Sequence, residues 1–170
     1  GCDIDYSLGK NFADFADQFS KDSRYRTELY KLRRKFMSHA DGLIHADLHT
    51  SNIMASRDKM KVIDMEFAFM GPFGYDLGYL VGNLISQYCA ACFKRFPSEQ
   101  SRKQFKAYLL ATIKSLIETY MKTFTLCWEK SVKERYRGQQ GLLQSILQEV
   151  MEDVPGYASM VNWFRSVSEI

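Results

Sequence analysis

Residues Leu77–Ser86 form a stretch, Leu-Gly-Tyr-Leu-Val-Gly-Asn-Leu-Ile-Ser, that is apolar on almost every side of a helical turn. Such a helix is stable only when other elements enclose it, so the stretch predicts a central buried helix with an N-cap at Asp76 and an end near residue 93. With 170 residues, 46% of them hydrophobic, the chain can form one domain with a real core. We expect further helices at residues 11–19, 24–39, 98–126, 141–152 and 156–168.

One short segment departs from this helical pattern. A polar loop from His45 to Asn52 precedes two apolar runs, Ile53–Ala55 and Met60–Ile63, which are joined by residues 56–59. The runs predict two strands of a small hairpin. The expected fold class is therefore mainly α (α+β): a single domain over residues 1–170, a helical bundle with a small β-hairpin beside the polar loop.

The polar loop holds residues suited to phosphoryl transfer. Asp47 is followed five positions later by Asn52. In that reaction one carboxylate accepts the proton of the attacking hydroxyl and a second polar oxygen reaches a metal ion. The protein-kinase pattern H-R-D-x-x-x-x-N has the same spacing. Taken alone, the two residues also fit a turn-stabilising role.

Two carboxylates after the hairpin strengthen the catalytic interpretation. Asp64 and Glu66 are two positions apart, so a continued strand would place both on one face. At about 4 Å apart they would repel by about 4 kcal/mol at an effective dielectric constant of 20, which favours a bound cation. Mg²⁺ with Asn52 as a further ligand is the expected occupant. A solvent-facing acidic turn is the alternative.

His45, His49 and Asp76 are assigned to orienting the loop. A histidine beside a catalytic carboxylate more often holds the loop backbone than moves protons, although proton transfer stays open. A metal site formed by His45, Asp47 and His49 is a further alternative.

Charge and cysteine usage exclude several classes of function. The net charge of +3 is too small to indicate a nucleic-acid partner, and no apolar stretch is long enough to indicate a membrane span. Cys89 and Cys92 form a C-x-x-C with no second pair to complete a zinc site, so we expect buried thiols within a helix. Unpaired thiols suit a reducing compartment and favour the cytoplasm.

Two longer motifs are similar to a known family. H-A-D-L-H-T-S-N-I-M, from His45 to Met54, and V-I-D-M-E-F-A-F-M-G-P-F-G-Y-D, from Val62 to Asp76, resemble the methylthioribose kinases of the aminoglycoside phosphotransferase and choline kinase superfamily. The resemblance extends more weakly over nearly the whole chain. It implies a protein-kinase-like C-terminal lobe that phosphorylates the 1-hydroxyl of 5-methylthioribose, a step in methionine salvage, with ATP and Mg²⁺ as cofactors.

The resemblance also implies roles for individual residues. Asp47 would be the catalytic base, Asp64 and Glu66 would hold Mg²⁺-ATP, and Arg165 would contact the substrate. The chain departs from the family where Ala46 replaces a glycine, where Ser51-Asn52 replaces Gly-Ser, and where Phe164 replaces an arginine. The last change leaves two alternatives open: a kinase acting on choline, an aminoglycoside or homoserine, and a kinase-derived binding module without catalysis.

The sequence also lacks the motifs of a nucleotide-gripping lobe. Only Gly1, Gly9 and Gly42 precede the catalytic loop, so a glycine-rich phosphate loop is not formed, and no strand lysine of the V-A-I-K type is found. We therefore expect the N-terminal lobe to be absent and the isolated chain to show little turnover. The expected partners are a small-molecule substrate and either that lobe or a second copy of the chain, which would cover the exposed floor of the nucleotide cleft.

Overall fold

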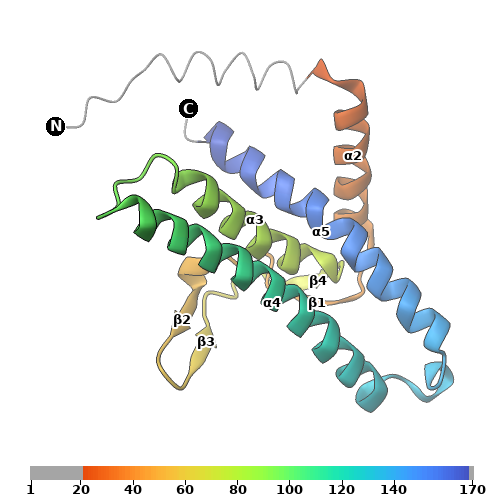
Figure 1. Ribbon diagram of the computed structural model, residues 1–170. Helices are drawn as coiled ribbons and strands as arrows, with labels where there is room; N and C mark the ends of the chain where they lie inside the picture. Colours follow the sequence, from red (N-terminus) through yellow and green to blue (C-terminus); the bar gives the residue numbers. More distant parts are fainter. Residues whose placement is uncertain (1–20, 169–170) are drawn as a thin grey trace.

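The computed structural model describes residues 21–168, with side chains described up to residue 160. The predicted mainly helical architecture with a small hairpin is confirmed (Figure 1). The helix expected at residues 11–19 lies outside the described residues. In chain order the elements are α2 (Ser23–Ser38), β1 (Gly42–Ile44), η1 (Thr50–Asn52), β2 (Ile53–Ala55), β3 (Met60–Val62), β4 (Phe69–Gly71), α3 (Gly74–Ala90), α4 (Glu99–Ser131), η2 (Glu134–Tyr136) and α5 (Gln140–Ser168).

Helix α3 is the central element, as its all-round apolar sequence predicts. It lies between α4 and α5; in Figure 1, β1 and β4 lie behind these helices and the β2–β3 hairpin projects below α4. The buried core joins α3 to α5 and is covered by partly buried side chains of α4 and of the α3 N-terminus. Its fully enclosed members are Leu77, Val81, Val150, Val154 and Ala158.

Glycines on α3 allow α5 to approach closely. A Cβ atom added at Gly78 would lie 2.6 Å from the Cβ of Tyr157, and one at Gly82 would lie 2.6 Å from the backbone oxygen of Ala158. Neither distance is possible for real carbon and oxygen atoms, so a larger residue would push the helices apart. This contact fixes α5 against the helix that supports the polar loop.

Helix α5 differs from the sequence prediction of two helices at 141–152 and 156–168. It runs without interruption from Gln140 to Ser168, with Pro155 in its interior. A proline removes one backbone hydrogen bond and disfavours the helix by about 3 kcal/mol. The residues on either side of it, Val154 and Tyr157, are buried against α3. Their packing carries the helix across the proline, an effect that local propensity cannot reveal.

The N-terminus of α3 also corrects the prediction. The helix begins at Gly74 and its N-cap position is Phe73, so Asp76 lies in the first turn rather than at the cap. The carboxylate of Asp76 is instead used by the polar loop, as described below. Helix α4 begins after its cap Ser98, as expected, but continues to Ser131, five residues beyond the predicted end.

The strands form two separate antiparallel pairs. Strands β2 and β3 form the predicted hairpin, with Ile53 opposite Val62 and Ala55 opposite Met60. The second pair, in which Leu43 of β1 lies opposite Met70 of β4, was not predicted. Unlike β2 and β3, these two strands are far apart in the chain and are not joined by a short turn, so no local hairpin signal marks them. This second pair joins the start of the polar loop to the start of α3.

Cys89 and Cys92 are exposed, which contradicts the prediction of buried thiols. Both lie at the C-terminal end of α3, where Ala90 is the last helical residue, so Cys92 falls beyond the helix. The buried residues of α3 end at Leu84, and the apolar composition of the last turn does not reflect burial. Among residues 21–168, no helix is long and apolar enough to cross a membrane.

Candidate functional site

The polar loop is attached to α3 by the carboxylate of Asp76. Its Oδ2 accepts a hydrogen bond from the backbone N–H of His45 at 2.6 Å, and its Oδ1 accepts one from Ala46 at 2.9 Å. Burial raises the pKa of Asp76, and the two N–H groups partly offset this rise. A carboxylate that binds two consecutive backbone amides fixes the direction in which the chain leaves β1.

Ala46 lies in a strained backbone conformation at this point. Its φ is 66°, in the left-handed region that residues with a Cβ atom rarely adopt. Glycine, which has no Cβ atom, would adopt this conformation freely. The attachment to Asp76 holds Ala46 in place despite the strain.

The His45 ring connects the loop to the segment after the hairpin. Nε2 of His45 lies 2.8 Å from the backbone oxygen of Ile63, and Nδ1 accepts a hydrogen bond from the N–H of Asp47 at 3.3 Å. The pair of contacts fits a neutral ring with its proton on Nε2. Both ring nitrogens are therefore engaged with backbone, and the ring joins the loop to the residue that precedes Asp64.

Two asparagines hold the remainder of the loop. Oδ1 of the buried Asn83 accepts hydrogen bonds from the hydroxyl of Thr50 at 2.7 Å and from its N–H at 3.3 Å. Asn52, also buried, donates from Nδ2 to the backbone oxygen of Asp47 at 3.0 Å. The backbone oxygen of Asn52 accepts from Ile63 at 3.0 Å. The loop is thus fixed at its start, middle and end.

The Asp47 carboxylate is partly exposed and contacts three side chains. Oδ1 accepts a hydrogen bond of 2.9 Å from the hydroxyl of Tyr79. Oδ2 has longer contacts, 3.4 Å to Nε2 of His49 and 3.5 Å to Nδ2 of Asn52. Nδ1 of His49 is buried and has no hydrogen-bond partner within residues 21–160. One carboxylate oxygen is thus firmly held and the other is open to a further donor.

Asp64 and Glu66 are not arranged as a continued strand would place them. Strand β3 ends at Val62, Asp64 has a φ of 65°, and the N–H of Ala68 closes a turn on the oxygen of Met65 at 3.1 Å. A left-handed residue followed by a turn breaks the two-residue alternation on which the prediction depended. Both carboxylates are exposed, and Ile63 ties this segment to the loop through its hydrogen bonds with Asn52 and His45.

The fit of these residues to a magnesium ion depends on their donor atoms. Because Nδ2 of Asn52 faces Asp47, the amide oxygen is the atom left for a metal. Two exposed carboxylates and one amide oxygen are hard ligands of the kind Mg²⁺ takes, with phosphate oxygens completing the set. Within the described residues, no three His, Cys, Asp or Glu side chains converge as a metal-binding group. The histidine-containing metal site considered from the sequence is therefore not formed.

The predicted site residues do not all fall in the described part of the chain. The side chains of Arg165 and Phe164 lie outside it. Tyr79 and Asn83, which contact the loop directly, were missed by the sequence analysis. The signal was present: Asp76, Tyr79 and Asn83 recur at i, i+3 and i+7, a polar line along one side of an otherwise apolar helix.

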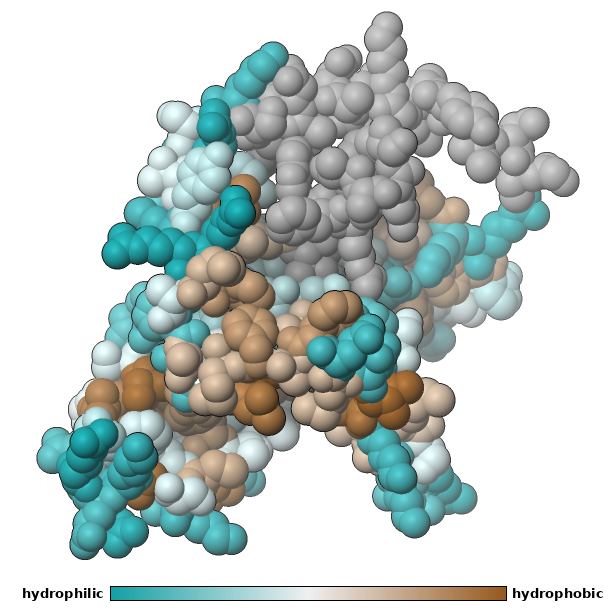
Figure 2. Space-filling view, turned by 180° about the vertical axis from the view of Figure 1, so that it is seen from behind, coloured by the Kyte–Doolittle hydropathy of each residue, from teal (hydrophilic) through white to brown (hydrophobic). Residues whose placement is uncertain are grey.

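An exposed apolar surface surrounds this site. Figure 2, which views the molecule from behind, shows apolar side chains gathered over the strands. The most exposed of them belong to the two strand pairs and to the turn around Asp64. They are Leu43, Met54, Met60, Val62, Ile63, Met65, Phe67 and Met70. Contiguous apolar exposure of this kind marks a surface that another molecule or domain covers.

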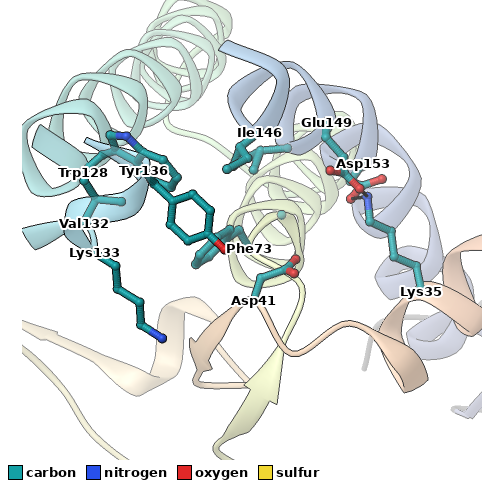
Figure 3. A pocket seen from close by; sticks show the side chains of 12 residues that line it. Lys35, Asp41, Phe73, Trp128, Val132, Lys133, Tyr136, Ile146, Glu149 and Asp153 are labelled. Atoms are coloured by element: carbon teal, nitrogen blue, oxygen red, sulfur yellow. Dashed lines mark ion pairs between the residues drawn. The ribbon is translucent and has the colours of Figure 1, made fainter. Parts of the chain in front are cut away.

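A separate cavity of about 400 Å³ lies at the N-terminal end of α3 (Figure 3). Phe73, Trp128 and Tyr136 form one wall, and Glu149 and Asp153 of α5 face them from the other. The ammonium of Lys35 on α2 forms ion pairs with both of these carboxylates. None of the predicted site residues whose side chains the structure describes lines this cavity.

Comparison with known proteins shows that this chain is similar to a family of enzymes. The model of the phosphotransferase enzyme family matches residues 6–116. The chain is 33% identical over 142 residues to a methylthioribose kinase of Exiguobacterium sibiricum, which covers 84% of this chain and 34% of that protein. It is 37% identical over 137 residues to a methylthioribose kinase of Geobacillus thermodenitrificans, covering 81% and 32% of the two chains.

A plant relative is also similar. The chain is 38% identical over 110 residues to methylthioribose kinase 1 of Oryza sativa subsp. japonica, covering 65% of this chain and 25% of that protein. The chain thus spans about a third of the length of the bacterial relatives it matches and a quarter of the rice protein.

Proposed function

Because this chain belongs to the phosphotransferase enzyme family, we propose that it forms the catalytic lobe of a small-molecule kinase that transfers the γ-phosphoryl group of ATP to a hydroxyl of its substrate. The observation that carries this proposal is the Asp47 carboxylate, held in a loop that Asp76, Asn83 and Asn52 fix from three sides. A carboxylate presented in this way can accept the proton of an attacking hydroxyl.

The residues of the chain have separate tasks in this reaction. Asp47 accepts the proton, and His45, His49 and Asp76 orient the loop that carries it. Asn52, Asp64 and Glu66 hold the nucleotide through a magnesium ion, which neutralises charge on the transferring phosphoryl group. The exposure of Asp64 and Glu66 supports this assignment, because metal ligands that also bind phosphates must be reachable from solvent.

We propose 5-methylthioribose as the substrate, phosphorylated at its 1-hydroxyl. The support is the name shared by the bacterial and plant relatives, methylthioribose kinase, at 33–38% identity. Choline, an aminoglycoside or homoserine is the alternative, since Phe164 departs from the family pattern beside Arg165. Arg165 remains the proposed substrate contact.

We further propose that the apolar surface around the site receives a nucleotide-gripping lobe. A kinase requires a glycine-rich loop and a lysine above the phosphates, and such a lobe would cover the exposed side chains of β1 to β4. Association of two copies through the same surface is the alternative. Covering these side chains would remove the largest apolar exposure near Asp47.

The test uses the native polypeptide that carries this sequence, at whatever length it is made. We expect Mg²⁺-ATP-dependent phosphorylation of 5-methylthioribose, and no comparable turnover of choline, kanamycin or homoserine. Asp47→Asn should lower kcat by about 10²- to 10⁴-fold, the usual contribution of a positioned base, while nucleotide affinity stays within about twofold.

The matched variant is Asp64→Asn, which should instead weaken Mg²⁺-nucleotide binding, measured by calorimetry with a non-hydrolysable ATP analogue. Full activity in Asp47→Asn would overturn the catalytic proposal. Unchanged nucleotide affinity in Asp64→Asn would remove the assignment of the metal ligands and favour a binding module without catalysis.

A further inference from the structure

The two oxygens of the Asp47 carboxylate are held differently. Oδ1 accepts the 2.9 Å hydrogen bond from Tyr79, whereas the nearest donors to Oδ2, on His49 and Asn52, lie at 3.4 and 3.5 Å. A hydrogen bond to oxygen normally measures about 2.5–3.0 Å from a hydroxyl and about 2.7–3.2 Å from an N–H group, so the Tyr79 contact lies within its range and the contacts of His49 and Asn52 lie beyond theirs. Oδ1 is therefore engaged within the protein, and Oδ2 is the oxygen with capacity to spare.

We propose that Tyr79 is a positioning residue that fixes the Asp47 carboxylate so that Oδ2, and not Oδ1, receives the proton of the substrate hydroxyl. This inference rests on the proposed function and extends it to the direction of proton transfer. Tyr79 acts through Asp47 and is not required to touch the substrate. Nothing in the sequence pattern around Asp47 points to a tyrosine 32 residues away.

The Tyr79 ring is itself held by other aromatic rings. It packs against Tyr75 with centroids 6.0 Å apart and the planes inclined by 52°. Tyr75 in turn packs against Phe36 of α2 at 4.6 Å and against the fully buried Tyr157 of α5 at 5.1 Å. Burial raises the pKa of Tyr75 well above its usual range, with smaller contributions from Tyr79, Asp76 and Asp47.

The packed rings of Tyr157, Tyr75 and Tyr79 connect the core to the Asp47 carboxylate. Because Tyr75 is packed by rings of α2 and α5, it forms a fixed surface against which the Tyr79 ring lies. A residue locked by packing on a helix holds a functional group more accurately than one on a mobile loop. The hydroxyl is therefore placed before any substrate arrives.

The hydrogen bond from Tyr79 is compatible with every stage of the transfer. The substrate hydroxyl gives its proton to Oδ2 as its oxygen forms the new bond to phosphorus, and the bond between phosphorus and ADP breaks with its electron pair passing to ADP. Asp47 then carries the proton on Oδ2, while Oδ1 still accepts from Tyr79. The Tyr79 bond need not break at any point, so it adds no barrier of its own.

The test is Tyr79→Phe in the native polypeptide, a change that keeps the ring and removes only the hydroxyl. Loss of a hydrogen bond to a charged group should lower kcat about tenfold, with KM for both substrates within about twofold. The carboxylate loses a donor that favours its ionised form, so the acidic limb of the kcat–pH profile should move to higher pH. A purely structural role for the hydroxyl would leave that limb in place.

Tyr120→Phe is the matched control. Its hydroxyl donates to the backbone oxygen of Phe73 at 3.1 Å, away from Asp47, and its removal should leave kcat and the pH profile unchanged. A measurement independent of turnover follows the ¹³C signal of the Asp47 carboxyl group through a pH titration. The midpoint should move in Tyr79→Phe and stay in Tyr120→Phe.

The outcomes separate this inference from the proposed function. An inactive Asp47→Asn together with a Tyr79→Phe variant of normal kcat, pH profile and ¹³C midpoint would overturn the role of Tyr79 and leave the kinase assignment intact. A fully active Asp47→Asn would overturn both. Reduced kcat with a displaced acidic limb in Tyr79→Phe alone supports the inference.

Discussion

The loop at residues 45–52 and the turn at residues 64–66 are assigned to the same reaction, but the fold holds them differently. Side chains of α3 and the loop's own Asn52 fix the loop in place. The proposed general base, Asp47, accepts a hydrogen bond from the hydroxyl of Tyr79. The turn carries exposed carboxylates, and within the described residues the backbone of Ile63 connects it to the loop.

The difference follows from what each region must do. A general base works only within hydrogen-bonding reach and in the correct orientation, so its geometry must be set in advance. Carboxylates that share a metal ion with phosphates are oriented in part by the ligand itself. We therefore expect the stability of the fold to depend on the anchors of the loop and hardly at all on the acidic turn.

Replacing the anchor at the start of the loop should have the largest effect. Asp76→Asn removes the charge from an acceptor of two backbone amides and turns an NH₂ group toward one of them, so we expect the free energy of unfolding to fall by about 3 kcal/mol. Urea denaturation followed by circular dichroism measures this. Glu66→Gln is the counterpart in the turn and should change stability by less than about 0.5 kcal/mol.

The stability difference between wild type and Asp76→Asn should also depend on pH, in a direction that the structure predicts. Because burial raises the pKa of Asp76, its contribution to stability is complete below the ordinary carboxyl range and declines as the pH rises through the elevated value. The stability difference between wild type and Asp76→Asn should thus shrink with rising pH above about 4. A difference that grows with pH would show that the two amides outweigh burial.

A smaller effect is expected at the middle of the loop. Asn83→Ala removes the acceptor for Thr50 and leaves a small cavity beside α3, which together should lower the free energy of unfolding by about 2 kcal/mol. Thr50→Val removes only the hydroxyl from the exposed side of the same contact. It should lower the free energy of unfolding by less, because Asn83 still accepts the hydrogen bond from the backbone N–H of residue 50. Equal losses in Glu66→Gln and Asn83→Ala would contradict the contrast between loop and turn.

The sequence predicted this loop well because its information is local. The spacing of Asp47 and Asn52, the hairpin strands and the all-round apolar helix are each contained in a few consecutive residues, and the structure has all of them. The pairing of β1 with β4 and the contact of Tyr79 with Asp47 join segments about 30 residues apart. The sequence marks Tyr79 as part of a polar line on α3, but it does not say which distant segment that line contacts, and it carries no local signal for the pairing of β1 with β4.

Three of the wrong predictions share one cause. Asp76 was placed at the helix cap because its type favours caps, α5 was divided at Pro155, and Asp64 was given a strand geometry because an apolar strand precedes it. In each case a local preference lost to tertiary contacts: the amides of His45 and Ala46, the packing of Tyr157, and the ties of Ile63 to the loop. Local propensity is a weak guide wherever such contacts converge.

The strain at Ala46 gives the smallest effect and tests the loop from the opposite direction. If α3 holds residue 46 at a φ of 66° against its preference, Ala46→Gly should relieve the strain and raise the free energy of unfolding by about 1 kcal/mol, net of the greater freedom of glycine in the unfolded chain. Ala111→Gly, at an exposed position within α4, is the matched control and should lower it by about 1 kcal/mol. Chemical denaturation of both variants decides the point: if Ala46→Gly destabilises as much as the control, the loop is not held under strain at residue 46.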